Sequence, residues 1–232
     1  MIIFETIETI LKESGADFVL FVDITNLSCE ENKNYSHAIL FGITLSTDYL
    51  QNIMNTPDYI QARIRNNSDF LDDEFYLAEL QTDELADKIA QLLNNNGYKA
   101  YSHSEKNQKE TSFLDKIHLK TPLPHKTIAR IAGIGWIGKN NLLITPNFGC
   151  ALCLGVVITN ASLKITTSNS TQSKCNNCNI CIKLCEPKAL KGIAWNLNTK
   201  REEMLDIFKC TTCLNCVIFC PWTQNYGIVN LV

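Results

Sequence analysis

The last third of the chain carries eight cysteines in two runs with identical spacing. The first run is Cys-x2-Cys-x2-Cys-x3-Cys over 175–185, and the second repeats it over 210–220. A proline follows each run closely, at Pro187 and Pro221. This pattern constrains the fold more than any hydrophobic periodicity does, because eight thiols in two short segments have to meet around whatever they bind.

The spacing is that of bacterial two-cluster ferredoxins, in which the fourth cysteine of each run ligates the other cluster. Three cysteines two residues apart wrap one turn of backbone around a cuboidal [4Fe–4S] cluster, and the fourth lies on the following turn and points away. Two cluster sites are therefore predicted. The first cluster site has the ligands Cys175, Cys178, Cys181 and Cys220. The second cluster site has the ligands Cys210, Cys213, Cys216 and Cys185.

Zinc and disulfides are the alternatives to clusters. CxxC pairs also make structural zinc sites, but a zinc site has no use for the repeated x3 cysteine. Residues 1–18 carry acids where a secretory signal has a basic segment, so a reducing, cytoplasmic location is expected. Of the other cysteines, Cys150 and Cys153 are predicted to be buried core residues and Cys29 an exposed thiol.

The region before the cysteine runs alternates helical and strand patterns, which indicates an α/β (α+β) fold class. The expected helices are 3–14, 47–56, 58–96 and 124–133. The expected strands are 18–24, 37–45 and 98–103, with a hairpin over 142–160. The polar stretch 104–112 is expected to be a loop, and the Ser/Thr/Asn-rich stretch 166–173 a linker. Two domains follow, 1–165 and 166–232.

A glycine-rich turn, Gly-Trp-Ile-Gly-Lys-Asn at 135–140, lies between the last helix and the hairpin. Gly135 and Gly138 let the backbone approach a large flat ligand. Trp136 offers a packing face, and Lys139 and Asn140 offer donors to amide or phosphate groups. These five residues are therefore candidates for cofactor binding. The alternative is a tight helix-to-strand connection in which Trp136 is buried and Lys139 is solvated.

The segment AGIGWIGKNNLLITPNFGCALCLGVVITNASL (132–163), followed by the double cysteine run, resembles the epoxyqueuosine reductases and their relatives, the reductive dehalogenases. The resemblance is contiguous over 132–221. It implies a nitroreductase-like, three-layer sheet-and-helix domain followed by a ferredoxin-like module. It also implies cobalamin, bound base-off between the two, with the glycine-rich turn at its site.

Two departures from the family pattern bear on the substrate. The family carries an Asp-Ser-Ala-Pro motif whose aspartate donates a proton, and the matching positions here are Leu119-Lys120-Thr121-Pro122. Epoxide reduction is therefore in doubt. His118 is a candidate proton donor because histidine titrates near neutrality, with Tyr101 and Asp115 as further options. The family's tRNA-binding repeat region has no counterpart before Val232, so a tRNA substrate is not expected.

These features predict a cytoplasmic oxidoreductase that uses two [4Fe–4S] clusters and cobalamin to reduce a small-molecule or corrinoid substrate. Its electrons would come from a donor such as a ferredoxin or flavodoxin. The alternative is an electron-transfer protein that delivers low-potential electrons to a separate corrinoid protein or flavoprotein, and the missing aspartate favours it. No stretch is long and apolar enough to cross a bilayer, so no membrane partner is expected.

Overall fold

The computed structural model of the protein describes residues 3–56, 58–66, 69–166 and 172–229. The chain divides into two compact units, each built from segments that are distant in the sequence. Unit 1 comprises Met1–Thr44, Leu77–Gly133 and Cys153–Asn169. Unit 2 comprises Leu45–Tyr76, Ile134–Leu152 and Ser170–Val232.

This division differs from the expected boundary between residues 165 and 166. Segments 45–76 and 134–152 belong to the same unit as the cysteine runs. A module of 67 residues buries only about 60% of the surface that its unfolded chain exposes, so its core is marginal when it stands alone. The cysteine runs therefore share a core with helices and strands that come from earlier in the chain.

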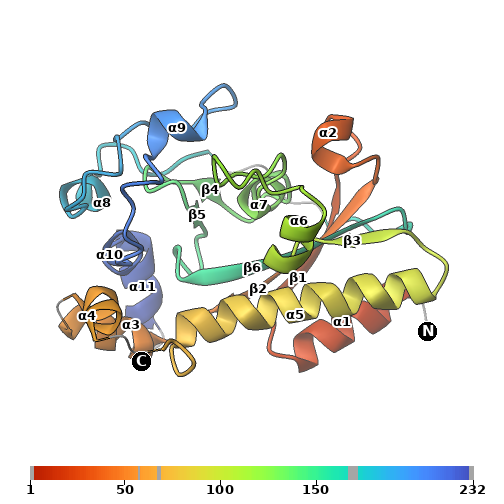
Figure 1. The fold of residues 1–232 in the computed structure, drawn as a ribbon, viewed down its shortest axis with the longest axis horizontal. Helices are drawn as coiled ribbons and strands as arrows, with labels where there is room; N and C mark the ends of the chain where they lie inside the picture. The colour runs from red at the N-terminus through yellow and green to blue at the C-terminus, as the bar shows by residue number, and fades with distance from the viewer. Residues whose placement is uncertain (1–2, 57, 67–68, 167–171, 230–232) are drawn as a thin grey trace. The chain divides into compact units, whose positions relative to one another are not determined.

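Unit 1 is built on a four-stranded sheet in the order β1-β2-β6-β3 (Figure 1). Strands β1 (Phe18–Asp23) and β2 (His37–Thr44) pair antiparallel. Strands β3 (Ala100–Ser102) and β6 (Leu152–Thr159) also pair antiparallel. The strands predicted over 18–24, 37–45 and 98–103 are thus confirmed to within a few residues.

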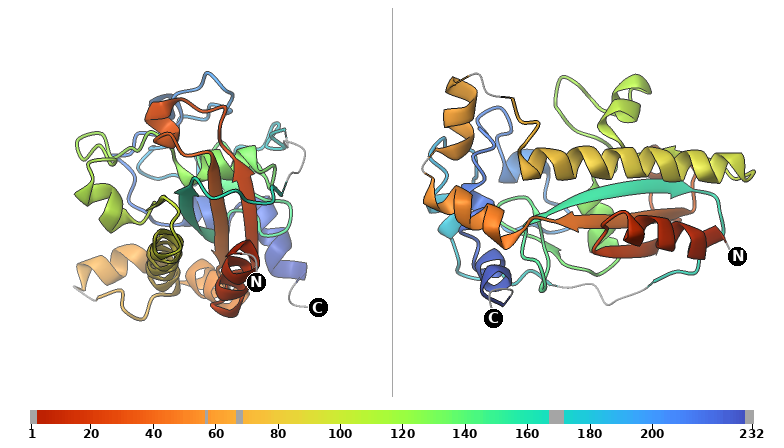
Figure 2. Two further views of the ribbon diagram at one scale, coloured as in Figure 1. Left: turned by 90° about the vertical axis from the view of Figure 1, so that its right-hand side faces the viewer. Right: turned by 90° about the horizontal axis from the view of Figure 1, so that it is seen from below.

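Helices cover both faces of this sheet. Helices α1 (Ile3–Glu13) and α5 (Glu74–Asn95) lie together against one face (Figures 1 and 2). Ile39 and Phe41 of β2 belong to the core beneath them. Because strand side chains alternate, the residues between these point to the other face, where α7 (His125–Ile131) contacts β2. The sheet-and-helix layering expected for this region is confirmed.

Two predictions about helices were wrong. The segment 58–96 forms two helices, α4 (Tyr59–Arg65) and α5, because Asp73 caps the start of α5 by accepting the N–H of Tyr76 at 3.0 Å. The segment 104–112, expected to be a loop, contains helix α6 (Glu105–Glu110). Ser104 caps that helix in the same way. A serine at this position is typical of a helix start, so the sequence did contain a signal for α6.

The predicted hairpin over 142–160 was also wrong in its pairing. Strand β5 (Leu143–Ile144) pairs antiparallel with β4 (Trp136–Ile137), while β6 joins the large sheet. The turn itself is present, since Thr145 and Gly149 exchange backbone hydrogen bonds of 2.8 and 3.1 Å. Most of the predicted linker, 167–171, lies outside the described residues.

Unit 2 consists mainly of short helices around the cysteine runs. Its remaining helices are α3 (Thr47–Asn55), α8 (Ile180–Lys183), α9 (Arg201–Met204), α10 (Asn215–Ile218) and α11 (Pro221–Val229). Helix α10 contacts α3, α8 and α11, so it lies at the centre of the unit. The segment between the two runs is closed by a backbone bridge between Leu190 and Leu205.

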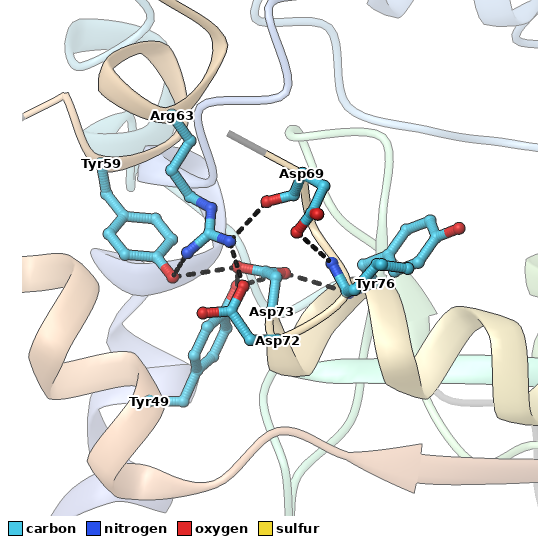
Figure 3. Close-up of polar contacts among 8 residues, drawn as sticks. Tyr49, Tyr59, Arg63, Asp69, Asp72, Asp73 and Tyr76 are labelled. Atoms are coloured by element: carbon cyan, nitrogen blue, oxygen red, sulfur yellow. Dashed lines mark hydrogen bonds and ion pairs between the residues drawn. The ribbon is translucent and has the colours of Figure 1, made fainter. Parts of the chain in front are cut away.

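A buried carboxylate connects three helices of this unit (Figure 3). Asp73 is 1% exposed and accepts hydrogen bonds from the hydroxyls of Tyr49, at 3.0 Å, and Tyr59, at 3.1 Å. Burial, together with the charge of Asp73, raises the pKa of the Tyr49 hydroxyl. Arg63 donates to the carbonyl of Asp69 at 2.6 Å. This network fixes α3, α4 and the start of α5 relative to one another.

Among the described helices, none combines the length and apolar character needed to cross a bilayer.

Unit 1 contains a buried histidine in an aromatic surrounding. His103 is 1% exposed, and its ring lies 5.6 Å from Tyr101, 5.4 Å from Phe113 and 5.7 Å from His125. Within the described residues, neither ring nitrogen of His103 has a hydrogen-bond partner. Burial, followed by the charges of His125 and Lys33, holds the pKa of His103 well below its usual value. The folded protein therefore keeps this imidazole neutral.

We predict that this histidine makes the folded state less stable in acid. The unfolded chain binds a proton at His103 once the pH falls below about 6.5, whereas the folded chain does not, so stability is full above that pH and declines below it. Replacing His103→Phe should remove about 1 kcal/mol of the stability loss between about pH 7.5 and about pH 5.5. Urea unfolding under anaerobic conditions measures this difference. Equal slopes for wild type and His103→Phe would contradict the prediction.

Candidate metal centre

Four cysteine thiols from both runs surround one cavity of unit 2. The cavity has a volume of about 170 Å³. Its lining residues are Lys139, Asn140, Ile144, Lys174, Cys175, Cys178, Cys181, Cys220, Pro221 and Trp222. The four cysteines are the predicted ligands of the first cluster site. Three of them belong to the first run, whereas Cys220 is the last cysteine of the second run and lies 35 residues after Cys185, the last cysteine of the first. The fold therefore brings the fourth cysteine of the second run to the first run.

Local backbone structure places each of these thiols. The N–H of Cys178 donates to the carbonyl of Cys175 at 2.8 Å, which turns the chain between the first two cysteines. Cys181 lies in helix α8. Cys220 immediately precedes Pro221, the first residue of α11, where proline is favoured because its missing N–H costs no helical hydrogen bond.

The electrostatic surroundings of Cys181 show that these thiols are close together. Burial first, and then the thiols of Cys175, Cys220 and Cys178, raise the pKa of Cys181 to about 11. Neighbouring thiolates repel one another, so each resists losing its proton until a cation offsets the charge. Such a group of thiols is suited to a cationic iron–sulfide core, which would take up the negative charge.

The remaining four cysteines form a second group. Burial first, and then the thiols of Cys213 and Cys210, raise the pKa of Cys216 to about 12. Cys185 of the first run also contributes to this shift, as does Cys181. The structure thus brings together the residues predicted for the second cluster site. Because the thiol of Cys181 raises the pKa of Cys216, which belongs to the other group, the two groups are neighbours within the unit.

The thiols of the first cluster site surround a space larger than one ion needs. In the described part of the chain, no three His, Cys, Asp or Glu side chains are grouped so as to hold a metal ion. The thiols of the first cluster site instead surround a cavity of about 170 Å³. A multi-iron cluster needs this wider spacing, because each cysteine binds a different iron at a corner of the cube.

Lys139 of the glycine-rich turn holds the loop that carries the first cysteines. Its ammonium group donates to the carbonyls of Asn176, at 2.8 Å, and Cys178, at 3.0 Å, and to the side-chain oxygen of Asn179, at 2.9 Å. A second cation, Lys174, lies 5.5 Å from the ring of Trp222. Two lysines lining the same cavity would offset the negative charge of a thiolate-bound cluster.

Asn140 and Trp136 are built into the wall behind this cavity. The Asn140 amide donates to the carbonyl of Cys216, at 3.1 Å, and to the thiol of Cys150, at 3.4 Å. Trp136 is 2% exposed and packs edge-on against Trp222, with ring centroids 4.9 Å apart. Its indole Nε1 is buried without a hydrogen-bond partner among the described residues.

The two glycines of the turn are required by close packing within β4–β5. A side chain at Gly135 would lie 2.1 Å from the carbonyl oxygen of Ile144. One at Gly138 would lie 2.4 Å from the Ile144 side chain and 2.6 Å from that of Asn140. The described contacts of the turn therefore support the first cluster site, and its predicted role in binding cobalamin stays a prediction.

Two residues at the first cluster site were not identified from the sequence. Cys150, predicted to be a buried core residue, is 5% exposed, but its sulfur accepts a hydrogen bond from the amide of Asn140, which lines the cavity, at 3.4 Å. Thr223 is 1% exposed and contacts Cys150 with both backbone and hydroxyl groups. The sequence offered one signal for Thr223: it lies three residues after Cys220, at the start of a helix. Cys153 is buried and Cys29 exposed, as predicted.

The candidate proton donor His118 lies in unit 1, on a loop closed by paired backbone bonds between Asp115 and Lys120. Its side chain is 61% exposed, and its Nδ1 lies 2.7 Å from the Asp115 carboxylate. Hydrogen bonds from the backbone and the ring of His118 lower the pKa of Asp115. Leu119, at the position of the family's aspartate, has a φ of +49°. The hydroxyl of Tyr101 lies 2.6 Å from that of Thr111.

Comparison with known sequences connects the chain to one enzyme family. No family model matches it. It is 34% identical over 116 residues to the epoxyqueuosine reductase of Listeria monocytogenes, covering 43% of this chain and 29% of that protein. It is 33% identical over 118 residues to the enzyme of Synechococcus sp., covering 46% and 36%. The match to the enzyme of Francisella cf. novicida is 24% identical and covers 74% and 43%.

Solved structures share the fold. An epoxyqueuosine reductase from Streptococcus thermophilus superposes with a TM-score of 0.55 at 17% identity, over 97% of this chain and 67% of that one. The catabolic reductive dehalogenase NpRdhA, in complex with 3-bromo-4-hydroxybenzoic acid, gives a TM-score of 0.63 at 19% identity, over 94% and 31%. A further reductive dehalogenase, whose structure suggests a mechanism for B12-dependent dehalogenation, gives 0.63 at 18% identity.

The chain spans between about a quarter and a half of the length of the curated relatives it matches. The structural likeness extends over nearly all of this chain. Part of the chain is therefore similar in sequence to epoxyqueuosine reductases, and the chain shares a mixed helix-and-sheet fold with the solved epoxyqueuosine reductases and reductive dehalogenases.

Proposed function

We propose that this protein is a cytoplasmic iron–sulfur reductase that holds two [4Fe–4S] clusters and uses cobalamin. Its substrate is a small molecule or a corrinoid, and its electrons come from a ferredoxin or flavodoxin. The observation that carries the proposal is the cavity lined by Cys175, Cys178, Cys181 and Cys220, which draws thiols from both sequence runs. The cytoplasm follows because ligand thiols have to remain reduced.

The residues present fit an iron–sulfur cluster well. Four thiols supply the ligands, Lys139 and Lys174 supply positive charge, and Trp222 and Ile144 supply apolar surface that excludes water. Exclusion of water and nearby cations both shift the potential at which a cluster accepts an electron. The protein's own contribution to electron transfer is thus to hold two clusters close together and to tune each potential.

The fit to cobalamin rests on the family likeness. The polar side-chain atoms of Lys139 and Asn140 already have partners within unit 2, so we assign no cobalamin contact to them. Cobalamin, when bound, supplies a redox-active cobalt that performs the reduction of the substrate. The chain's part is to deliver electrons through the two cluster sites, one at a time.

An electron-transfer protein is the second candidate function. The sequence has leucine at position 119, where the related enzymes carry their proton-donating aspartate, and His118 beside it is largely exposed. A carrier needs no proton donor, because an electron passed to a separate corrinoid protein or flavoprotein requires no bond to the substrate. Binding of cobalamin separates the two functions.

Because each run is proposed to supply one ligand to the other run's cluster, the iron content of cysteine variants can be predicted. Anaerobically reconstituted wild-type protein should hold about eight iron atoms. Replacing Cys175→Ala or Cys220→Ala should each remove about four, and the same cluster signal should disappear from the electron paramagnetic resonance spectrum. Cys210→Ala and Cys185→Ala should both remove the other signal. The buried Cys153→Ala is the matched control and should keep all the iron.

If Cys220→Ala instead removed the same signal as Cys210→Ala, each run would ligate its own cluster and the proposed exchange would be wrong. Iron far below about eight in the wild type, with zinc in its place, would show a structural metal site.

The second prediction concerns cobalamin itself. Titration of the iron-loaded protein with cobalamin should convert the visible spectrum to the base-off form and leave cobalamin bound through gel filtration. Protein-free cobalamin under the same conditions is the control. A spectrum that stays base-on, with no retention, would support the electron carrier over the reductase.

The third prediction tests the substrate class. Leucine at a φ of +49° is strained by on the order of 1 kcal/mol, and aspartate and asparagine tolerate this conformation better, so Leu119→Asp should fold and hold its iron. We expect this variant, like its control Leu119→Asn, to leave an epoxyqueuosine-modified tRNA stem loop unreduced. Reduction by Leu119→Asp but not Leu119→Asn would show that the tRNA site is intact and refute our proposal of a different substrate.

A further inference from the structure

A lysine immediately precedes each cysteine run, and the two lysines have different surroundings. Lys174 comes before Cys175, and Lys209 comes before Cys210. The ammonium group of Lys209 lies 3.7 Å from the carboxylate of Asp206, which offsets its charge. Lys174 lines the cavity of the first cluster site, and it has no hydrogen-bond or ion-pair partner in the part of the chain that the structure describes.

Two tryptophans hold the Lys174 side chain beside this cavity. Its ammonium group lies 5.5 Å from the ring centre of Trp222 and 5.8 Å from that of Trp136. A cation within about 6 Å of an aromatic ring centre is attracted by the ring's electron density. The two indole rings pack edge-on at 4.9 Å, so they form one aromatic wall for the ammonium group.

The other lysine of the cavity, Lys139, has a different role. Its three N–H groups are used by the carbonyls of Asn176 and Cys178 and by the side-chain oxygen of Asn179. These oxygens already offset part of its positive charge. Among the described residues that line the cavity none is acidic, so Lys174 is the lysine whose charge is left unopposed.

We propose that Lys174, held by Trp136 and Trp222, tunes the first cluster site for electron transfer by raising its reduction potential. Reduction adds one electron to that site and oxidises the electron donor by one electron. A nearby positive charge stabilises the added negative charge, so it stabilises the reduced cluster more than the oxidised one. This inference rests on the proposed iron–sulfur function.

The consequence is a difference between the two cluster sites. Lys174 is exposed, so water screens its charge, and we expect an effect of about threefold in the reduction equilibrium. For a one-electron couple this corresponds to about 28 mV. The effect of Lys209 on the second site should be smaller, because Asp206 offsets its charge. A higher potential at the first site would favour electron flow toward it from the second.

The test is a redox titration of iron-loaded protein, with dithionite as reductant, monitored by electron paramagnetic resonance. Lys174→Gln removes the charge and should lower one midpoint potential by about 28 mV. The affected signal should be the one that Cys175→Ala abolishes. Lys174→Arg keeps a cation that packs on tryptophan, so it should keep the wild-type midpoint. Lys209→Gln is the matched control and should leave both midpoints nearly unchanged.

A double-variant cycle tests the role of the tryptophans. Trp222→Leu removes one of the two rings and should let the ammonium group of Lys174 move into water. Lys174→Gln should therefore lower the midpoint less in the Trp222→Leu background than in the wild type. Equal shifts in the two backgrounds would show that the rings do not position the charge.

An unchanged midpoint in Lys174→Gln at full iron content would overturn the inference, as would the same fall in Lys174→Arg or in Lys209→Gln. Loss of iron from both Lys174 variants would also overturn it, since the lysine would then be needed to hold the cluster. A failure of the proposed function itself looks different, because the wild type would then show no cluster signal at all.

Discussion

The structure depends on each of the two cysteine runs supplying one thiol to the other run's group. Cys220 lines the cavity formed by the first run, and Cys185 influences the thiols of the second. Neither group of four is complete until both runs are folded and in contact. In the proposed cluster-binding protein, folding of this part of the chain would be thermodynamically coupled to cluster assembly, because the set of four thiols does not exist in the unfolded chain.

The glycine-rich turn serves this exchange by bracing both runs. Lys139 holds the loop of the first run through the carbonyls of Asn176 and Cys178, whereas Asn140 donates to the carbonyl of Cys216 in the second. Two adjacent side chains thus fix two segments that are about 40 residues apart. Gly135 and Gly138 allow β4 and β5 to approach closely enough for these side chains to reach. The turn acts as structural support for the metal centre, whatever else it binds.

A second polar network holds together helices α3 and α4, which come before β3 and β6 in the sequence. The hydroxyls of Tyr49 and Tyr59 meet at the buried carboxylate of Asp73, which keeps α3 and α4 in one arrangement. From α4, Gln61 donates to the carbonyl of Thr211, between the first two cysteines of the second run. The potential of a cluster depends on how rigidly its ligands and their neighbours are held. These two polar networks therefore connect packing far from the thiols to the position of the cysteine runs.

The sequence alone predicted which thiols come together. The repeated cysteine spacing predicted which four thiols would meet, because the geometry of a cuboidal cluster is strict and the spacing of its ligands is correspondingly specific. It also predicted the helices and strands with clear periodicity, such as α1, β1 and β2.

Only the tertiary structure decided the features that depend on contacts between distant segments. The pairing of β5 with β4, the membership of 45–76 and 134–152 in the cysteine-rich unit, and the placement of Cys150 against Asn140 have no local pattern. Each results from long-range packing and hydrogen bonding, which residue spacing does not encode.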